Sequence, residues 1–305
     1  MTVKPPDFGG KPYRSLDYHL RNRYGEKIYK VSLDGGMTCP NRDGTLGKCG
    51  CIFCSEGGSG DFAGDRTHPV HQQIEEQKTR LSPKFPATHF IAYFQAYTNT
   101  YAPVSYLKPL FMEAISQPEI VVLSIATRPD CLPPDVLHLL AECNRIKPVI
   151  VELGLQTSSE ATAQFIRRGY PLSVYDDAAT KLKGLGIEVV THVIAGLPGE
   201  TKQDFYNTLS HVAACHSDGI KIQLLHILKG TDLAALYESG QCTVLTQEEY
   251  IDLVLQSIAL LPPEITIHRL TGDGPKELLL APLWSSRKRD PQAAKTTEHL
   301  ARKGV

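Results

Sequence analysis

The chain has 305 residues, of which 42% are hydrophobic and 21% are charged, and its formal net charge is −1. This hydrophobic fraction supports a large buried core, and the near-zero net charge excludes a chain that binds polyanions by its overall charge alone. No stretch approaches the roughly 20 apolar residues that a membrane span needs, and the N-terminus has no apolar secretory core. We therefore expect a cytoplasmic protein without membrane association.

Basic residues gather toward the two ends of the chain. Residues 11–30 and residues 285–305 each carry a net charge of +4, which leaves −9 on residues 31–284. Basic ends on an acidic body indicate a polyanionic partner. Residues 11–30 also contain four tyrosines, and charge combined with stacking surfaces suits looped RNA. The alternative is a solvated face whose tyrosines pack on the rest of the protein.

From residue 28 onward, short apolar runs alternate with stretches of helical periodicity. The apolar runs are typical of strands buried on both faces, and they cover 28–33, 89–95, 120–127, 149–156, 188–194 and 220–227, with 264–270 as a candidate seventh. Helices are predicted over 72–81, 106–116, 134–145, 174–185, 202–215 and 247–261. Their start signals are Pro133–Pro134, the N-cap candidates Ser173 and Thr201, and a capping box of Thr246 with Glu249.

Strands that alternate with helices predict parallel βα units in an α/β protein. About six such units without a nucleotide-binding fingerprint favour a partial, open parallel β/α barrel over a doubly wound sheet. We place a basic and aromatic N-terminal segment at 1–27, the partial barrel at 28–262 and a C-terminal extension at 263–305. Polar clusters follow five of the strands, at 95–99, 127–130, 152–157, 192–198 and 226–229, which predicts a functional site at the C-terminal ends of the strands.

Four of the eight cysteines lie within residues 39–54, directly after the first predicted strand. Cys39, Cys51 and Cys54 form the pattern C-x11-C-x2-C, and Cys49 is a candidate fourth ligand. Three thiolates on a 4Fe–4S cluster leave one iron open to a small molecule, whereas four suit plain electron transfer. A structural zinc site is the alternative, although only one C-x2-C pair is present.

The chain resembles radical S-adenosylmethionine (SAM) enzymes, and within them the bacterial group related to the radical-SAM subunit of Elongator. The resemblance covers residues 13–284 and is carried by the segments Cys39–Thr45, Cys51–Cys54, Tyr93–Tyr97, Thr127–Cys131, Val151–Thr157, Arg168–Tyr170, Gly196–Glu200 and Leu225–Gly230. The segments are specific in combination, and with them the zinc alternative loses most of its support.

The resemblance implies that Cys39, Cys51 and Cys54 hold a 4Fe–4S cluster whose fourth iron binds SAM. It also implies a low-potential electron donor, because one electron cleaves SAM to methionine and a 5′-deoxyadenosyl radical. The superfamily usually has the spacing C-x3-C-x2-C, so the long first gap here leaves Cys49 as an alternative to Cys51 for the middle ligand.

The resemblance also assigns residues to a SAM pocket. Glu152 matches the group that binds the ribose hydroxyls, with a buried structural carboxylate as the alternative. Arg168 matches the group that pairs with the SAM carboxylate, with an exposed helix-end arginine as the alternative. Gln156 is expected at the methionine part of SAM, and the adenine is expected beside Ile194 and Gly196. The usual Gly-Gly-Glu motif is absent, and Gln95 stands in its region.

Three residues are candidates for roles in catalysis. Cys131 is a candidate hydrogen donor in the radical chamber, or else a small buried hydrophobe. His226 and Lys229 follow the sixth strand and are expected to contact substrate or SAM, although a lone histidine is more often a core residue. Arg128 and Asp130 are expected to pair with each other.

The family resemblance further implies an enzyme that acts on tRNA, at the carbon-5 substituent of a wobble uridine. For the bacterial group it indicates remodelling of a carboxymethylaminomethyl side chain toward aminomethyl. A radical SAM enzyme with a small-molecule substrate is the first alternative, since the net charge permits it. A non-catalytic, zinc-stabilised RNA-binding protein is the second alternative.

Overall fold

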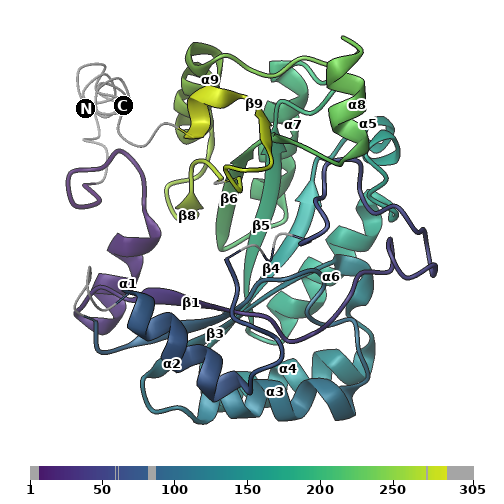
Figure 1. Ribbon diagram of the computed structural model, residues 1–305. Helices are drawn as coiled ribbons and strands as arrows, with labels where there is room; N and C mark the ends of the chain where they lie inside the picture. The colour runs from purple at the N-terminus through teal and green to yellow at the C-terminus, as the bar shows by residue number, and fades with distance from the viewer. Residues whose placement is uncertain (1–6, 59, 61, 82–86, 273, 287–305) are drawn as a thin grey trace.

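Seven parallel strands form one open sheet in the computed structural model, which describes residues 7–58, 60, 62–81, 87–272 and 274–286 (Figure 1). The strand order follows the chain order, and the strands are β1 (Tyr29–Leu33), β2 (Phe90–Phe94), β3 (Ile120–Thr127), β4 (Val149–Gln156), β5 (Glu188–Ala195), β6 (Gly219–Leu224) and β8 (Thr266–Arg269). All neighbouring pairs are parallel. The predicted open parallel β/α barrel and its candidate seventh strand are confirmed.

The sixth predicted strand, 220–227, is shorter than expected. β6 ends at Leu224, and a separate strand β7 (Ile227–Leu228) pairs antiparallel with β9 (Leu279–Ala281). β8 lies in the predicted C-terminal extension, yet it pairs with β6 as a member of the main sheet. Most of the predicted basic segment 285–305 lies outside the described residues, and the domain boundaries stay predictions.

Helices cover one face of the sheet and form the outer layer of the half-barrel (Figure 1). They are α2 (Val70–Leu81), α3 (Val104–Ser116), α4 (Pro134–Ile146), α6 (Leu172–Gly184), α7 (Lys202–Ala214) and α9 (Gln247–Leu260), with the shorter α5 (Glu160–Phe165) and α8 (Asp232–Glu238) at connections. 3₁₀ turns span Pro129–Cys131 and Leu283–Ser286. None of the helices among the described residues is both long and apolar enough to span a bilayer.

Three of the predicted helix start signals are confirmed and one is wrong. α4 begins at Pro134, directly after Pro133. Thr201 and Thr246 each accept a hydrogen bond from the backbone three residues on, in capping boxes with Asp204 and Glu249. α6 begins at Leu172, and its N-cap is Pro171, which has an extended backbone. Ser173 therefore lies inside the first turn and is not the cap.

The helix α1 (Leu16–Tyr24), like the shorter α5 and α8, has no counterpart among the predicted helices. Ser15 caps it through a bond from the Tyr18 amide, but Leu20 is its only buried residue, so it lacks the apolar stripe that periodicity detects. Three of the four tyrosines of this region pack inward. Tyr13 and Tyr29 contact the main core, and the Tyr24 hydroxyl donates to the Val121 carbonyl. This packing matches the alternative to an RNA-stacking surface.

The inner face of the sheet changes character along the strands. Near their N-terminal ends it carries an apolar layer of Ile91, Val122, Ile150 and Val190, closed by Leu20 and Ile28. Because side chains on one face recur every second residue, the next inward positions toward the C-terminal ends are Tyr93, Ser124, Glu152 and His192. The polar residues of the site therefore stand directly on the apolar floor of the half-barrel.

Candidate active site

A cavity of about 480 Å³ opens at the C-terminal ends of the strands. Residues in or directly after all seven strands of the main sheet line it, together with the cysteine loop that follows β1. The half-barrel brings these segments together because parallel strands present their C-terminal ends at one edge. This is the position that the polar clusters of the sequence predict.

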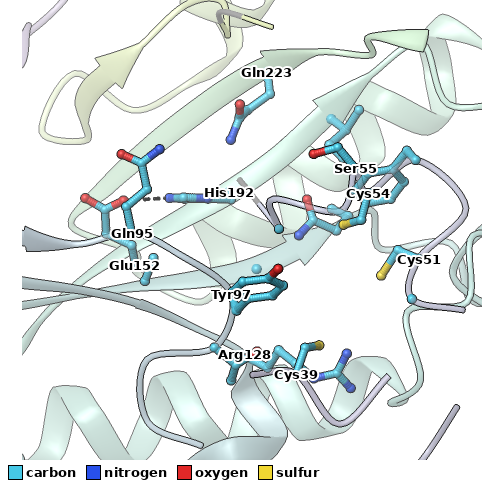
Figure 2. Close-up of a pocket in the computed structure, with 18 of the residues that line it drawn as sticks. Cys39, Cys51, Cys54, Ser55, Gln95, Tyr97, Arg128, Glu152, His192 and Gln223 are labelled. Carbon is cyan, nitrogen blue, oxygen red and sulfur yellow. Dashed lines mark hydrogen bonds and ion pairs between the residues drawn. The ribbon is translucent and has the colours of Figure 1, made fainter. Parts of the chain in front are cut away.

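Cys39, Cys51 and Cys54 all line the cavity (Figure 2), whereas Cys49 is exposed and is not among the described residues that line it. Asn41 shapes this loop: its buried side-chain amide donates to the Arg167 carbonyl at 2.8 Å and lies 3.5 Å from the Cys51 Sγ. Cys51 is therefore held on the cavity wall by a residue ten positions before it.

The thiols of the loop interact with one another. A hydrogen bond with Cys54 lowers the pKa of Cys51 to about 7, although burial opposes the shift. The same bond, together with burial and the nearby Cys39, raises the pKa of Cys54. Three mutually interacting thiols beside an open cavity are a donor set that fits a 4Fe–4S cluster with one iron left for another ligand.

Arg42 and Tyr97 brace the cysteine loop. The Arg42 guanidinium donates to the carbonyls of Cys54 and Ser55 at 3.0 and 2.5 Å, and it lies 5.7 Å from the centre of the Tyr97 ring. Tyr97 follows β2 with a left-handed backbone (φ 56°), and its amide donates to the Gly58 carbonyl at 2.9 Å. Both residues lie in segments that carry the family resemblance, but the sequence did not assign them a role.

Glu152 lies at the centre of a buried ionic network. Its Oε1 accepts from Lys30 Nζ at 2.6 Å and from Ser124 Oγ at 2.9 Å. Its Oε2 contacts His192 Nε2 at 2.8 Å and the Lys221 ammonium. The side chain of Glu152 is 0% exposed. Its contacts are those of a buried structural carboxylate, which was the alternative to ribose binding. The ribose role stays a prediction.

Burial and charge together set the protonation of this network. Burial alone would raise the pKa of Glu152, but the two lysines and the imidazole hold it well below its ordinary value. Burial lowers the pKa of Lys221 to about 7, with Lys30 and Arg269 acting in the same direction. Burial and Lys221 lower the pKa of His192 to about 4. At neutral pH the network therefore holds a carboxylate beside a neutral imidazole.

Arg168 is 2% exposed, so the alternative of an exposed helix-end arginine is wrong. Its Nη1 donates to the carbonyls of Leu155 and Thr157 at 3.1 and 2.6 Å, and its Nε donates to the Tyr170 carbonyl at 3.0 Å. Gln156, which lies between the first two acceptors, has a left-handed backbone (φ 67°) and lines the cavity. Arg168 also lines the cavity, and its pairing with a SAM carboxylate stays a prediction.

Gln95, Ile194 and His226 line the cavity as expected. The other candidates lie elsewhere: Gly196, Cys131 and Lys229 are not among the described residues of the cavity wall. A Cβ added at Gly196 would lie 3.1 Å from the side chain of Leu245, so Gly196 packs against that side chain.

Cys131 and Lys229 have local partners that explain their positions. Cys131 is 6% exposed, and burial raises the pKa of its thiol to about 12, as expected for a small buried hydrophobe. Lys229 is exposed and donates to the Glu277 carbonyl at 3.1 Å, because it directly follows β7, which pairs with β9. Arg128 and Asp130 form the predicted pair, with bonds of 2.9 and 2.7 Å.

Comparison with known proteins defines the class. The model of the radical SAM superfamily matches residues 38–212, and that of the radical SAM C-terminal domain matches residues 217–297. The chain belongs to the radical SAM superfamily. Enzymes of this superfamily use a 4Fe–4S cluster and SAM, so the predicted cofactors are confirmed for the family.

Among individual relatives, the uncharacterized protein YtqA of Bacillus subtilis is 48% identical over 278 residues, which are 91% of this chain and 86% of YtqA. Elongator complex protein 3 of Schizosaccharomyces pombe is 29% identical over 169 residues, which are 54% of this chain and 30% of that protein. The solved structure of the archaeal Elongator protein 3 of Methanocaldococcus infernus, with an N-terminal deletion, matches with a TM-score of 0.69 and 16% identity. The match covers 91% of this chain but 63% of that one, so the chain spans less than two thirds of the Elongator proteins it resembles.

Proposed function

We propose that this protein is a radical SAM enzyme that remodels the carbon-5 side chain of a tRNA wobble uridine, from carboxymethylaminomethyl toward aminomethyl. The observation that carries the proposal is a cavity with three cysteines in a chain related to Elongator complex protein 3. The cavity wall also carries five cationic side chains and one carboxylate, a balance that suits anionic ligands.

Cys39, Cys51 and Cys54 would hold the cluster. With SAM bound, this cofactor supplies a 5′-deoxyadenosyl radical, which removes a hydrogen atom from substrate. Gln156 of β4, Ile194 of β5 and Gln95, directly after β2, would then position SAM. The apolar floor would exclude water from the base of the cavity. His226 stands at the wall near the C-terminal segment and would contact substrate or SAM.

The decisive experiment is nucleoside mass spectrometry of tRNA from a strain that lacks the gene. We expect carboxymethylaminomethyl uridine to accumulate and its aminomethyl product to disappear. The wild-type gene and a Cys49→Ser variant should restore the profile, whereas Cys51→Ser should not. An unchanged wobble-uridine profile in the deletion strain contradicts the proposal.

The two alternatives give different outcomes in the same material. SAM cleavage by the purified protein, without any change in the tRNA profile, would favour a small-molecule substrate. A colourless protein that contains zinc after anaerobic purification, and that cleaves no SAM, would favour the zinc-stabilised RNA-binding protein. Affinity for tRNA that falls steeply with salt supports the proposed partner.

A further inference from the structure

The cationic side chains of the cavity wall fall into two groups. Three arginines near the cysteine loop are already engaged by the protein: Arg42 and Arg168 donate to main-chain carbonyls, and Arg128 pairs with Asp130. Lys221 and Arg269 form the second group, on the neighbouring strands β6 and β8. In the second group, Lys221 pairs with Glu152, whereas Arg269 has no ion-pair partner among the described residues.

Lys221 and Arg269 are register partners, so two like charges stand opposite each other in the sheet. Such a pair destabilises a sheet unless an anion lies between the charges. Glu152 is the only carboxylate among the described residues of the cavity wall, and Lys30 shares it with Lys221. No carboxylate among the described residues lies within ion-pair distance of Arg269, which is exposed. Among the described residues, the positive charge of Arg269 therefore has no counterpart in this part of the cavity.

The surroundings suit a small polar anion. Gln95 and Gln223 also line the cavity, and Figure 2 shows Gln95 and Glu152 on the side opposite Cys51 and Cys54. Lys221 is 5% exposed, so a ligand reaches it only through the cavity. A carboxylate on a short, flexible side chain can enter that far, whereas a backbone phosphate is fixed to the bulk of the nucleic acid.

We propose that Lys221 and Arg269 bind the carboxylate of the carboxymethylaminomethyl side chain and so select this substrate over its aminomethyl product. The inference rests on the proposed function. It assigns specificity to the one group that the substrate has and the product lacks. It also explains why two cations stand in register although Lys221 shares Glu152 with Lys30 and Arg269 has no carboxylate partner among the described residues. The aminomethyl product has lost the whole carboxymethyl group, so these two cations would no longer hold it.

The test is equilibrium binding of two anticodon stem-loop RNAs, one with carboxymethylaminomethyl uridine and one with aminomethyl uridine, followed by fluorescence anisotropy under anaerobic conditions. Wild-type protein should prefer the first RNA. Arg269→Gln should weaken binding of the first RNA about tenfold or more, the loss expected for a charge-assisted hydrogen bond. Binding of the second RNA should change less than about twofold on the same argument.

Matched variants separate charge from folding. Lys221→Arg should keep the preference and Lys221→Met should lose it, while Lys181→Gln, which removes a cation from the outer helix α6, should leave both affinities unchanged. Equal losses for both RNAs in Arg269→Gln would show a phosphate contact and overturn the proposal, as would a wild-type protein without preference. Failure of the proposed function would appear separately, as an unchanged nucleoside profile in the deletion strain.

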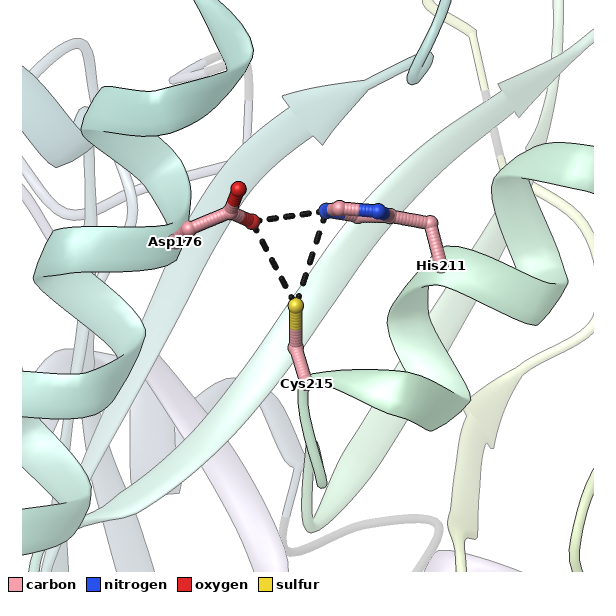
Figure 3. Close-up of side chains that lie close together, drawn as sticks. All are labelled: Asp176, His211 and Cys215. Carbon is pink, nitrogen blue, oxygen red and sulfur yellow. Dashed lines mark hydrogen bonds and ion pairs between the residues drawn. The ribbon is translucent and has the colours of Figure 1, made fainter.

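A second inference comes from three side chains outside the cavity (Figure 3). Asp176 on α6 faces His211 and Cys215, which lie four residues apart at the end of α7. The separations are 2.6 Å from Asp176 Oδ1 to His211 Nε2, 3.4 Å from the same oxygen to Cys215 Sγ, and 3.5 Å from that sulfur to Nε2. All three side chains are partly exposed.

These separations resemble one face of a tetrahedral zinc site. Zinc–ligand distances of roughly 2.0 Å to nitrogen and oxygen and 2.3 Å to sulfur give ligand–ligand edges of about 3.3–3.6 Å. The two edges to sulfur already have this length, and the oxygen–nitrogen edge would open by about 0.7 Å. We propose that Asp176, His211 and Cys215 bind one zinc ion that joins α6 to α7, with water as the fourth ligand.

Zinc and iron content of the reconstituted protein tests this site. After incubation with zinc and desalting, wild type should hold one zinc ion per chain in addition to its iron. Cys215→Ser and His211→Ala should lose the zinc and keep the iron, and Cys143→Ser, at a buried cysteine of α4, should keep both. Zinc should also raise the melting temperature of wild type but not of Cys215→Ser. Equal zinc content in wild type and Cys215→Ser would overturn the proposal.

Discussion

Arg168 holds Gln156 in a left-handed backbone conformation by donating to the carbonyls of the residues on either side of it. A residue with a side chain costs roughly 1–2 kcal/mol in that conformation, so the surrounding structure must stabilise it. Gln156 is the last residue of β4, and it lines the cavity. The strained backbone therefore lies at the point where β4 directs a side chain to the site.

This relationship predicts a rescue. Arg168→Lys loses the separate Nε bond to the Tyr170 carbonyl and replaces the planar guanidinium with a flexible ammonium, so it should lower the free energy of unfolding by about 2 kcal/mol. Gln156→Gly in the Arg168→Lys background should recover about 1 kcal/mol, because glycine adopts the left-handed conformation without strain. Urea unfolding of the two single variants and the double variant measures the coupling. If Gln156→Gly destabilised both backgrounds equally, Arg168 would not restrain this turn.

The cysteine loop predicts a difference between Cys49 and its three neighbours. Serine at Cys39, Cys51 or Cys54 should remove the brown iron–sulfur absorbance of anaerobically reconstituted protein and most of its iron. Serine at Cys49 should leave both unchanged, since this exposed side chain is outside the described wall of the cavity. Loss of the cluster in Cys49→Ser, with retention in Cys51→Ser, would reverse the assignment of the middle ligand.

Gly58 packs closely against the Tyr97 ring, and we expect the cysteine loop to depend on this contact. A Cβ at Gly58 would stand 2.3 Å from the Tyr97 ring, and Gly58→Ala should therefore displace the ring and lower iron incorporation. Gly240→Ala is the control, because Gly240 also has a positive φ but faces open space. Each variant carries a backbone cost of about 1 kcal/mol, and only Gly58→Ala should lose iron. Equal iron content in the two variants would argue against the brace.

The Glu152 network predicts loss of stability in acid. The pKa of His192 is about 4 in the folded protein against an ordinary 6.5, so the unfolded chain takes up this proton first as the pH falls. Stability should decrease between pH 6.5 and 4, and the depressed pKa of Glu152 adds to the decrease at the lower end of this range. His192→Gln should reduce the slope of unfolding free energy against pH in that window. An unchanged slope would mean that other groups cause the acid loss.

Local sequence features predicted much of the fold because their signals are short-range. The apolar runs identified all seven strands of the main sheet, and the side chains of Thr201 and Thr246 marked the starts of α7 and α9. The prediction failed where tertiary contacts supplied the energy. α1 buries one residue, and Pro171 rather than Ser173 precedes α6.

The sequence by itself determined the superfamily of this protein and showed four cysteines within residues 39–54, because motif order and spacing are properties of the chain alone. Only the tertiary structure decided which side chains meet. Lys30, Glu152 and Lys221 come together across 122 and 69 positions of the chain, and Arg168 turns inward to carbonyls of β4 and the loop after it. Such pairings depend on strand order and register, which bring distant residues to one face, and no local pattern records them.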